Sequence, residues 1–284
     1  MAYLLAIVSA VLYGSADFLG GLASRRASTI AVVFVSQLAG MLLLVAMLPV
    51  LPAVEFSSRD IIWGGMAGLA GGSGVALLYR ALAIGRMAMV APTTAVCAVV
   101  IPVAAAMLLG ERPPARALAG IALALVAIVL ISQQQTSADD VRSRATRALP
   151  PGLGLALLSG IAIGLFFLAL ARTASTAGMW PLVAARVVSV GLFGISAAAT
   201  GRSLVIRGRT LGLVIAGGAT DMVANALYLV ATRYGPLSSV VTLASLYPAS
   251  TIVLARVVLG ERLTRWQGAG IACAMIAVIL IVGG

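Results

Sequence analysis

The chain repeats itself with an offset of 150 positions, and no other feature of the sequence limits its fold as strongly. The clearest matching pairs are LGER at 109–112 and 259–262, GIALALVAIVLI at 120–131 and GIACAMIAVILI at 270–281, Ser9 and Ser159, and Gly14 and Gly164. One register without gaps extends from the first apolar stretch to the last. We therefore expect two halves with the same order of elements.

Apolar stretches of about 20 residues, long enough to cross a hydrocarbon core roughly 30 Å thick, follow one another along almost the entire chain. We expect ten transmembrane helices, near 2–22, 29–51, 60–82, 88–109, 116–133, 151–171, 179–200, 209–232, 236–258 and 264–283. Hydrophobic residues make up 62% of the chain, more than one soluble core can bury. The predicted fold class is an all-α integral membrane protein. Its first stretch has no basic lead-in, so we expect a retained helix rather than a signal peptide.

Each half carries five of these helices, and this odd number makes the repeat an inverted one. The first half is expected at 1–133 and the second at 151–284, joined by a polar linker at 134–150 that should tolerate shortening. After five crossings the second half enters the membrane from the opposite side. Two inverted five-helix repeats can exchange an inward-open for an outward-open arrangement, with a binding site between them near the middle of the membrane.

Two five-span repeats, each closing with an LGER turn and a final apolar helix that begins near a glycine, resemble the EamA-type members of the drug/metabolite transporter superfamily. The resemblance covers essentially the whole chain, and the paired LGER segments are its most specific element. It implies a ten-helix bundle that moves small metabolites, often an amino-acid exporter of the bacterial inner membrane. It does not identify the substrate, because relatives that share the repeat move different compounds.

Asp221 is the most informative ionisable residue, because it lies about halfway along a predicted span, where a charge costs roughly 2.5 to 3.5 kcal/mol. Asn225 and Tyr228 follow it by four and seven residues, which places all three on one helical face. Arg186, about one turn from the middle of the preceding span, is the expected ion-pair partner. Two interpretations stay open. The pair fixes helix packing, or it lines a cavity in which Arg186 binds a substrate carboxylate and Asp221 an amine or a proton.

The repeat favours a functional role for these residues, since residues that hold the two halves together should recur in both. The aligned residues differ in type: Asp221 and Gly71, Arg186 and Ser36, Asp17 and Phe167. Asp17 also lies within about two turns of Arg25 and Arg26. It is therefore a candidate for a structural ion pair or cap, and, together with Asp221, a candidate for proton coupling.

Other residues are weaker candidates for the cavity wall or for hinges. The further candidate substrate contacts are Tyr79, Thr94 and Ser245, and the candidate gate or kink positions are Pro92, Pro102 and Pro248. Each has a structural alternative, because hydroxyls bond back to their own helix and proline kinks are tolerated. The glycine-rich run at 64–74 indicates close helix packing or a sliding surface, and the LGER segments indicate helix ends or a gating role.

Several other classes of protein fit the sequence less well. The chain has no His, and Cys97 and Cys273 fall inside predicted spans, so no metal, cofactor or disulfide is expected. An aspartyl dyad of Asp17 and Asp221 would lack its usual motif, because Gly-Ala-Thr precedes Asp221. The formal charge of +11 comes from arginines that lie mostly at span ends, which predicts contact with membrane lipids rather than nucleic acid. A channel and a structural membrane protein stay as alternatives.

The sequence therefore predicts a secondary transporter, not an enzyme, that exports small polar metabolites, most of all amino acids, with other metabolites or drugs as the alternative substrates. Without a nucleotide-binding loop its energy must come from a gradient, and protons are the candidate coupling ion. A monomer is compatible with this scheme. The loops on the side of the termini hold five arginines and the other side eleven, which places both termini outside the cytoplasm. The family resemblance favours termini inside, and we follow the charge count.

Overall fold

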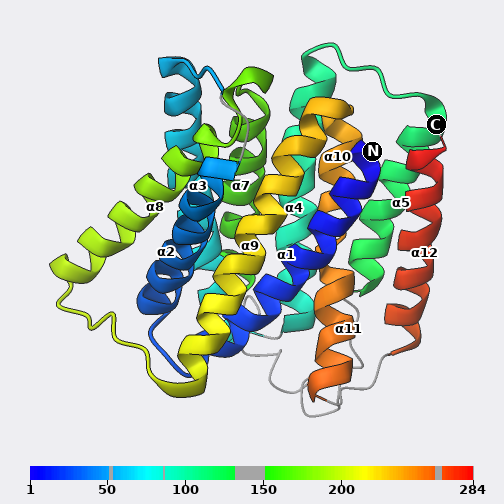
Figure 1. The fold of residues 1–284 in the computed structure, drawn as a ribbon. Helices are drawn as coiled ribbons and strands as arrows, with labels where there is room; N and C mark the ends of the chain where they lie inside the picture. Colours follow the sequence, from blue (N-terminus) through cyan, green and yellow to red (C-terminus); the bar gives the residue numbers. More distant parts are fainter. Residues whose placement is uncertain (51–53, 86, 132–150, 260–263, 284) are drawn as a thin grey trace.

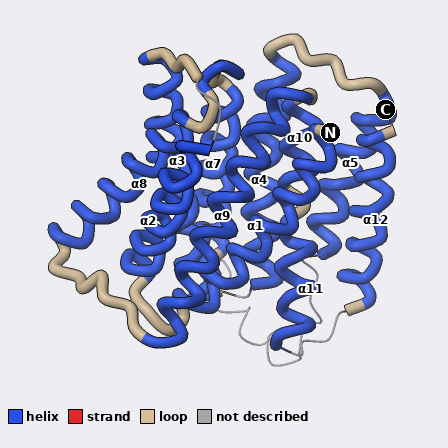
Figure 2. Tube along the Cα trace, in the orientation of Figure 1, coloured by secondary structure: helices blue, strands red, loops and turns tan. Residues whose placement is uncertain are grey.

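The structure, a computed structural model, describes residues 1–50, 54–85, 87–131, 151–259 and 264–283, and every regular element within these ranges is a helix (Figure 2). The first half contains α1 (Ala2–Ser24), α2 (Thr29–Met47), the short η1 (Leu48–Val50), α3 (Ser58–Ile84), α4 (Met87–Leu108) and α5 (Ala115–Ile131). The second half contains α7 (Leu153–Ala171), the short η2 (Ser175–Ala177), α8 (Trp180–Ala199), α9 (Gly208–Tyr234), α10 (Leu237–Ala244), α11 (Tyr247–Leu259) and α12 (Arg265–Val282).

The lengths and surfaces of these helices are those of a multi-pass membrane protein. Within the described ranges, eight spans are long and apolar enough to cross a bilayer, with α10 and α11 counted as one, and α4 and α5 supply two shorter apolar helices. Large apolar side chains lie on the outside of the bundle, among them Leu4, Ile195, Met275 and Ile279, each at least 65% exposed. Such a surface is suited to lipid, so the predicted fold class is confirmed.

The 150-residue repeat is a repeat of structure as well as of sequence. Subtracting 150 from the bounds of α9, 208–234, gives 58–84, which are the bounds of α3. Side-chain contacts repeat too: the Ser9 hydroxyl donates to the carbonyl of Ala224 at 2.8 Å, and the Ser159 hydroxyl donates to the carbonyl of Gly74 at 2.8 Å. Residues that hold the halves together therefore do recur.

The two halves pack through each other rather than side by side. In Figure 1 the helices run roughly along one axis, with both chain ends at the same end of the bundle. The first-half helix α1 packs against α9, α10 and α11, and its counterpart α7 packs against α3 and α4. Because each half completes its core with helices of the other, any space near the centre lies between the halves.

Small residues allow the closest of these crossings. Gly64 and Gly68 of α3 lie against the backbone of Pro181 and Ala185 in α8, where a methyl group would overlap it. Gly218 of α9, the repeat counterpart of Gly68, lies in the same way against α2. The close packing expected from the glycine-rich run is thus present, in the manner of small-residue interfaces in membranes.

The ninth span is broken, whereas the equivalent α4 is one helix. The break falls at Ser245 and Leu246, between α10 and α11, and Pro248 is the second residue of α11, where its missing N–H is tolerated. The backbone of α4 stays helical through positions 92 and 102. Pro102 is buried there, and the side chain of Pro92 lies outside the described residues.

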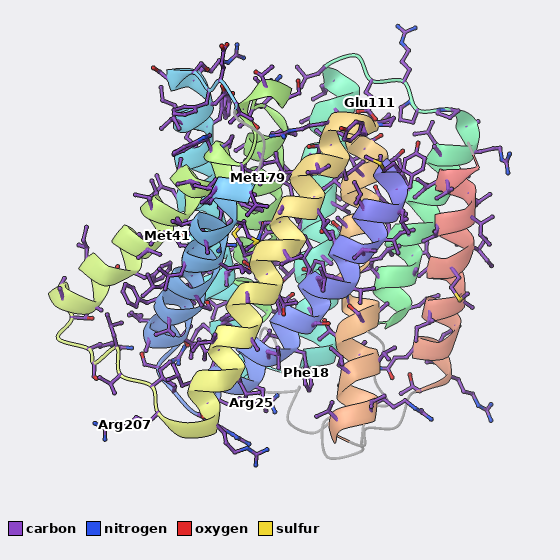
Figure 3. The ribbon with its side chains drawn as sticks, in the orientation of Figure 1. Phe18, Arg25, Met41, Glu111, Met179 and Arg207 are labelled. Atoms are coloured by element: carbon purple, nitrogen blue, oxygen red, sulfur yellow. The ribbon has the colours of Figure 1, made fainter. Side chains whose placement is uncertain are left out.

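The first LGER segment ends α4 and reaches across to the other half. Gly110 has φ 99°, and the N–H groups of Gly110 and Glu111 donate to the carbonyls of Met107 and Ala106, the pattern of a Schellman helix end. The Glu111 carboxylate then accepts hydrogen bonds from the backbone N–H of Ser238, at 3.2 Å, and from its hydroxyl, so it caps α10. Figure 3 shows Glu111 at the same end of the bundle as Met179, away from Arg25 and Arg207. The second LGER segment lies largely outside the described residues.

Candidate functional site

A cavity lies between the two halves, among α1, α2 and α3 on one side and α7, α8, α9 and α11 on the other. It encloses about 620 Å³ of space not filled by atoms, counting its mouth, of which about 50 Å³ can be reached by the centres of water molecules. Since one water needs roughly 10–15 Å³ of such space, the cavity has room for a few waters in this conformation.

Three helices direct pairs of polar side chains into this cavity, and the spacing within each pair is one helical turn. Tyr13 and Asp17 come from α1, Arg186 and Ser189 from α8, and Asp221 and Asn225 from α9. Residues three or four apart lie on one face of a helix, so the remaining faces stay apolar. The polar groups thus meet at the centre of the bundle while the outer surface faces lipid.

Arg186 is fixed by contacts with both halves. Its Nη2 donates to Asp221 Oδ2 at 2.5 Å, its Nη1 donates to Gln37 Oε1, and its Nε faces Met222 Sδ at 3.4 Å. The Arg186 side chain is 7% exposed and that of Asp221 18%. The ion pair expected from the sequence is therefore present, and Gln37 of α2 joins it across the interface between the halves.

A chain of hydrogen bonds continues from Asp221 to α1. Asn225 Nδ2 donates to Asp221 Oδ2 at 3.1 Å, and the Tyr13 hydroxyl donates to Asn225 Oδ1 at 2.8 Å. The Tyr13 ring packs edge-on against Phe167 of α7, with ring centroids 5.8 Å apart. These contacts hold one wall of the cavity in place through groups from both halves.

Asp17 differs from the other polar residues of the lining. It is partly buried, it lines the cavity, and it forms no hydrogen bond or ion pair with any residue that the structure describes. The ion pair with Arg25 or Arg26 that the sequence left open is thus not formed here. Figure 3 shows Arg25 at the end of the bundle, near the loop that follows α1.

Four other candidate residues lie outside the cavity lining. The Tyr228 hydroxyl donates to the carbonyl of Phe167 at 3.1 Å, so Tyr228 supports the cavity wall from behind. Tyr79 is buried against Gly20 of α1, and the Thr94 hydroxyl donates to the carbonyl of Ala156 in α7 at 3.1 Å. Ser245 is fully buried at the break of the ninth span, and its hydroxyl has no partner among the described residues.

Sequence reasoning missed Tyr13, Gln37, Ser189 and Tyr247, which supply half of the polar lining. The repeat contains a signal that separates them from their counterparts, because each aligns with a residue of a different kind. The aligned pairs are Tyr13 and Ile163, Gln37 and Val187, Ser189 and Ala39, and Tyr247 and Cys97. The same comparison had singled out Asp221 and Arg186.

The polar groups of this site suit the binding of a small molecule. No group of three or more metal-ligating side chains occurs among the residues the structure describes. A small cavity with an apolar wall and a few convergent polar groups is the usual form of a small-molecule site. Transporters built from inverted repeats bind their substrates between the two halves, and this cavity has the same position.

Comparisons with known proteins agree with this architecture. The model of the EamA-like transporter family matches residues 1–133 and 150–283. The crystal structure of another protein has a TM-score of 0.72 and 16% sequence identity to this chain, and the match covers 99% of this chain and 98% of the other. At that identity the likeness shows the fold alone. A search of curated proteins gave no match.

Proposed function

The chain belongs to the EamA-like transporter family, and we propose that it exports small polar metabolites, amino acids in particular, by alternating access. The observation that carries the proposal is the cavity between the inverted halves, lined by the ion pair of Arg186 and Asp221. Charged groups inside a membrane are costly, and they are commonly found where they line a pathway for a solute or a proton. The proposed location is the bacterial inner membrane.

Within the cavity, we assign substrate contact to Asp221 and Asn225. Both Asn225 and Arg186 reach the same oxygen of Asp221, Oδ2, and the Asp221 side chain keeps 18% of its surface exposed. Asp17 and Asp221 are the two carboxyl groups of the lining, so they are the candidates for exchange of a proton during the cycle. The energy source is then a proton gradient or the gradient of the substrate itself.

Flux in proteoliposomes tests this function. The purified protein is reconstituted, a panel of radiolabelled amino acids and related amines is offered, and uptake is followed with and without an imposed pH gradient. We expect saturable uptake of at least one compound above that of protein-free liposomes. Uptake equal to that of protein-free liposomes for the whole panel would contradict the proposal.

A matched pair of variants shows whether flux passes through the cavity. Val75 lines it, so Val75→Phe should reduce flux by narrowing the space. Val187 is 57% exposed on the outside of α8, so Val187→Phe makes the same substitution on the lipid face and should leave flux unchanged. Equal flux in both variants, with unchanged melting temperatures, would place the pathway elsewhere.

A further inference from the structure

Two polar groups of the cavity lining have no hydrogen-bond partner in the part of the chain that the structure describes, and they lie on helices of different halves. Asp17 of α1 has no hydrogen bond or ion pair with a described residue. The Tyr247 hydroxyl of α11 is buried with no hydrogen-bond partner, and the residue as a whole is only 3% exposed. Leaving such groups unpaired in a membrane costs free energy. A ligand that satisfies both would therefore bind favourably.

The fold keeps these two groups facing the same space. α11 is fixed to α1 by hydrogen bonds from the hydroxyls of Ser250 to the carbonyl of Ala10, at 3.2 Å, and of Thr251 to the carbonyl of Gly14, at 3.1 Å. Tyr247 lies one turn before these serine and threonine residues, at the break of the ninth span. Asp17 lies one turn after Gly14, and both side chains belong to the lining of the same cavity. Broken helices supply binding groups in many transporters.

The charges around the cavity favour a cation. Among the described residues the lining contains three acidic or basic side chains, the carboxyl groups of Asp17 and Asp221 and the guanidinium of Arg186. Arg186 already neutralises Asp221 and also bonds to Gln37, so a substrate carboxylate would have to displace one of these partners. Asp17 has no opposing charge among the described residues. When Asp17 is ionised, one negative charge in the cavity is therefore left without compensation by these residues.

The chemistry of the two unpartnered groups indicates an ammonium group. An ammonium has three N–H donors, enough to donate to both the carboxylate and the hydroxyl oxygen. A metal cation such as Ca²⁺ takes six or more oxygen ligands, which these two groups do not provide. An anion would be repelled by Asp17. The rings of Phe166 and Phe167 in the same lining suit the hydrocarbon part of an organic cation and attract its charge.

We propose that this cavity selects an organic cation with a net positive charge, such as a dibasic amino acid or the corresponding amine, and that Asp17 and Tyr247 bind its ammonium group. The proposal rests on the transport function and narrows its substrate class. Binding of the ammonium group is thus a role of Asp17, separate from the role of the ion pair of Arg186 and Asp221. A neutral or acidic amino acid of the same length should bind worse, because its α-ammonium is offset by its own carboxylate and it has no net positive charge to compensate Asp17.

Equilibrium binding to the purified protein tests the proposal without relying on flux. The probes are lysine, its neutral derivative Nε-acetyllysine, and glutamate, all offered at neutral pH. We expect lysine to bind at least about tenfold more tightly than either of the others, about 1.4 kcal/mol. Asp17→Asn should lower the affinity for lysine by about tenfold or more, and Tyr247→Phe should lower it less.

The control variants make equivalent changes away from the cavity, one from a carboxylate to an amide and one from tyrosine to phenylalanine. Glu55→Gln removes an exposed carboxylate, and Tyr234→Phe removes the hydroxyl of a tyrosine that is 64% exposed. Neither should change lysine binding. Melting temperatures show whether Asp17→Asn has folded, and the comparison of the three probes on the unaltered protein needs no variant at all.

The outcomes separate the charge preference from transport itself. Equal or tighter binding of Nε-acetyllysine or glutamate, or unchanged lysine binding in folded Asp17→Asn, would overturn the proposal. Flux of such a neutral or acidic compound in proteoliposomes would leave the transport function standing. Tight, Asp17-dependent lysine binding without flux of any compound would support the cation site and overturn transport. Failure of every probe to bind would count against the cation site.

Discussion

Removing the charges of Asp221 and Arg186, singly and together, tests the assignment of Asp221 as a substrate contact. Asp221→Asn keeps the size of the side chain and an oxygen that can accept from Arg186. Arg186→Gln removes the donors to Asp221 and Gln37 at once. The double variant leaves no charge at either position. A purely structural pair and a substrate-binding pair respond differently to these three changes.

The geometry sets the expected magnitudes. Removing one partner of a fully buried ion pair costs about 3–5 kcal/mol. Asp221 is 18% exposed to the cavity, and an asparagine still accepts one hydrogen bond, so we expect Asp221→Asn to cost about 1–2 kcal/mol. Arg186→Gln leaves the Asp221 carboxylate without its charged partner, although Asn225 still donates a hydrogen bond to it. We expect this change to lower the free energy of unfolding by about 3 kcal/mol. The double variant should cost no more than Arg186→Gln alone, because the charges are removed together.

Chemical unfolding and flux are measured on the same preparations. We expect Asp221→Asn to stay folded while its flux falls about tenfold or more, the effect of losing one charge-assisted contact. The double variant should be destabilised by less than the sum of the two single variants, while its flux should stay low. If the double variant regains both stability and flux, Asp221 is a packing residue and its assignment as a substrate contact fails.

Three further predictions concern the scaffold. Gly218→Ala should lower the free energy of unfolding by about 1–3 kcal/mol, because the added methyl group would overlap the backbone of Ser36. Gly212 lies in the same helix with open space beside it, so Gly212→Ala should not lower the melting temperature. Glu111→Gln should weaken the cap of α10 and cost about 1 kcal/mol in the free energy of unfolding. A single cysteine placed within 134–148 should react with an impermeant thiol reagent from the cytoplasmic side, and labelling from the periplasm would reverse the orientation that follows from the arginine count.

The helices and their repetition were predictable because both depend on local, additive properties. Apolar length determines where a span begins and ends, and the offset of 150 identified the counterparts that form equivalent hydrogen bonds, such as Ser9 and Ser159. The ion pair of Arg186 and Asp221 followed from the cost of an isolated charge in a membrane. Each inference needed only the type of a residue and its depth in a span.

The composition of the cavity depended on helix rotation, which the sequence does not encode locally. Tyr228 shares a helical face with Asp221, yet it turns towards Phe167 and not into the cavity. Tyr247 reaches the lining because the span breaks just before it, and a broken span looks in sequence like a continuous one with a proline. The role of Glu111 was equally hidden, because its partner lies 127 residues further along the chain.

The central claim is that one cavity, between the halves, opens to each side in turn and holds the substrate. Val75→Cys places a thiol in its lining, in a chain whose Cys97 and Cys273 have been replaced by alanine. In sealed vesicles of either orientation, we expect an impermeant thiol reagent to modify this cysteine from both sides of the membrane, and a saturating transported substrate to slow the reaction. A cysteine that reacts from one side only, or at a rate that the substrate does not change while flux continues, would contradict the account.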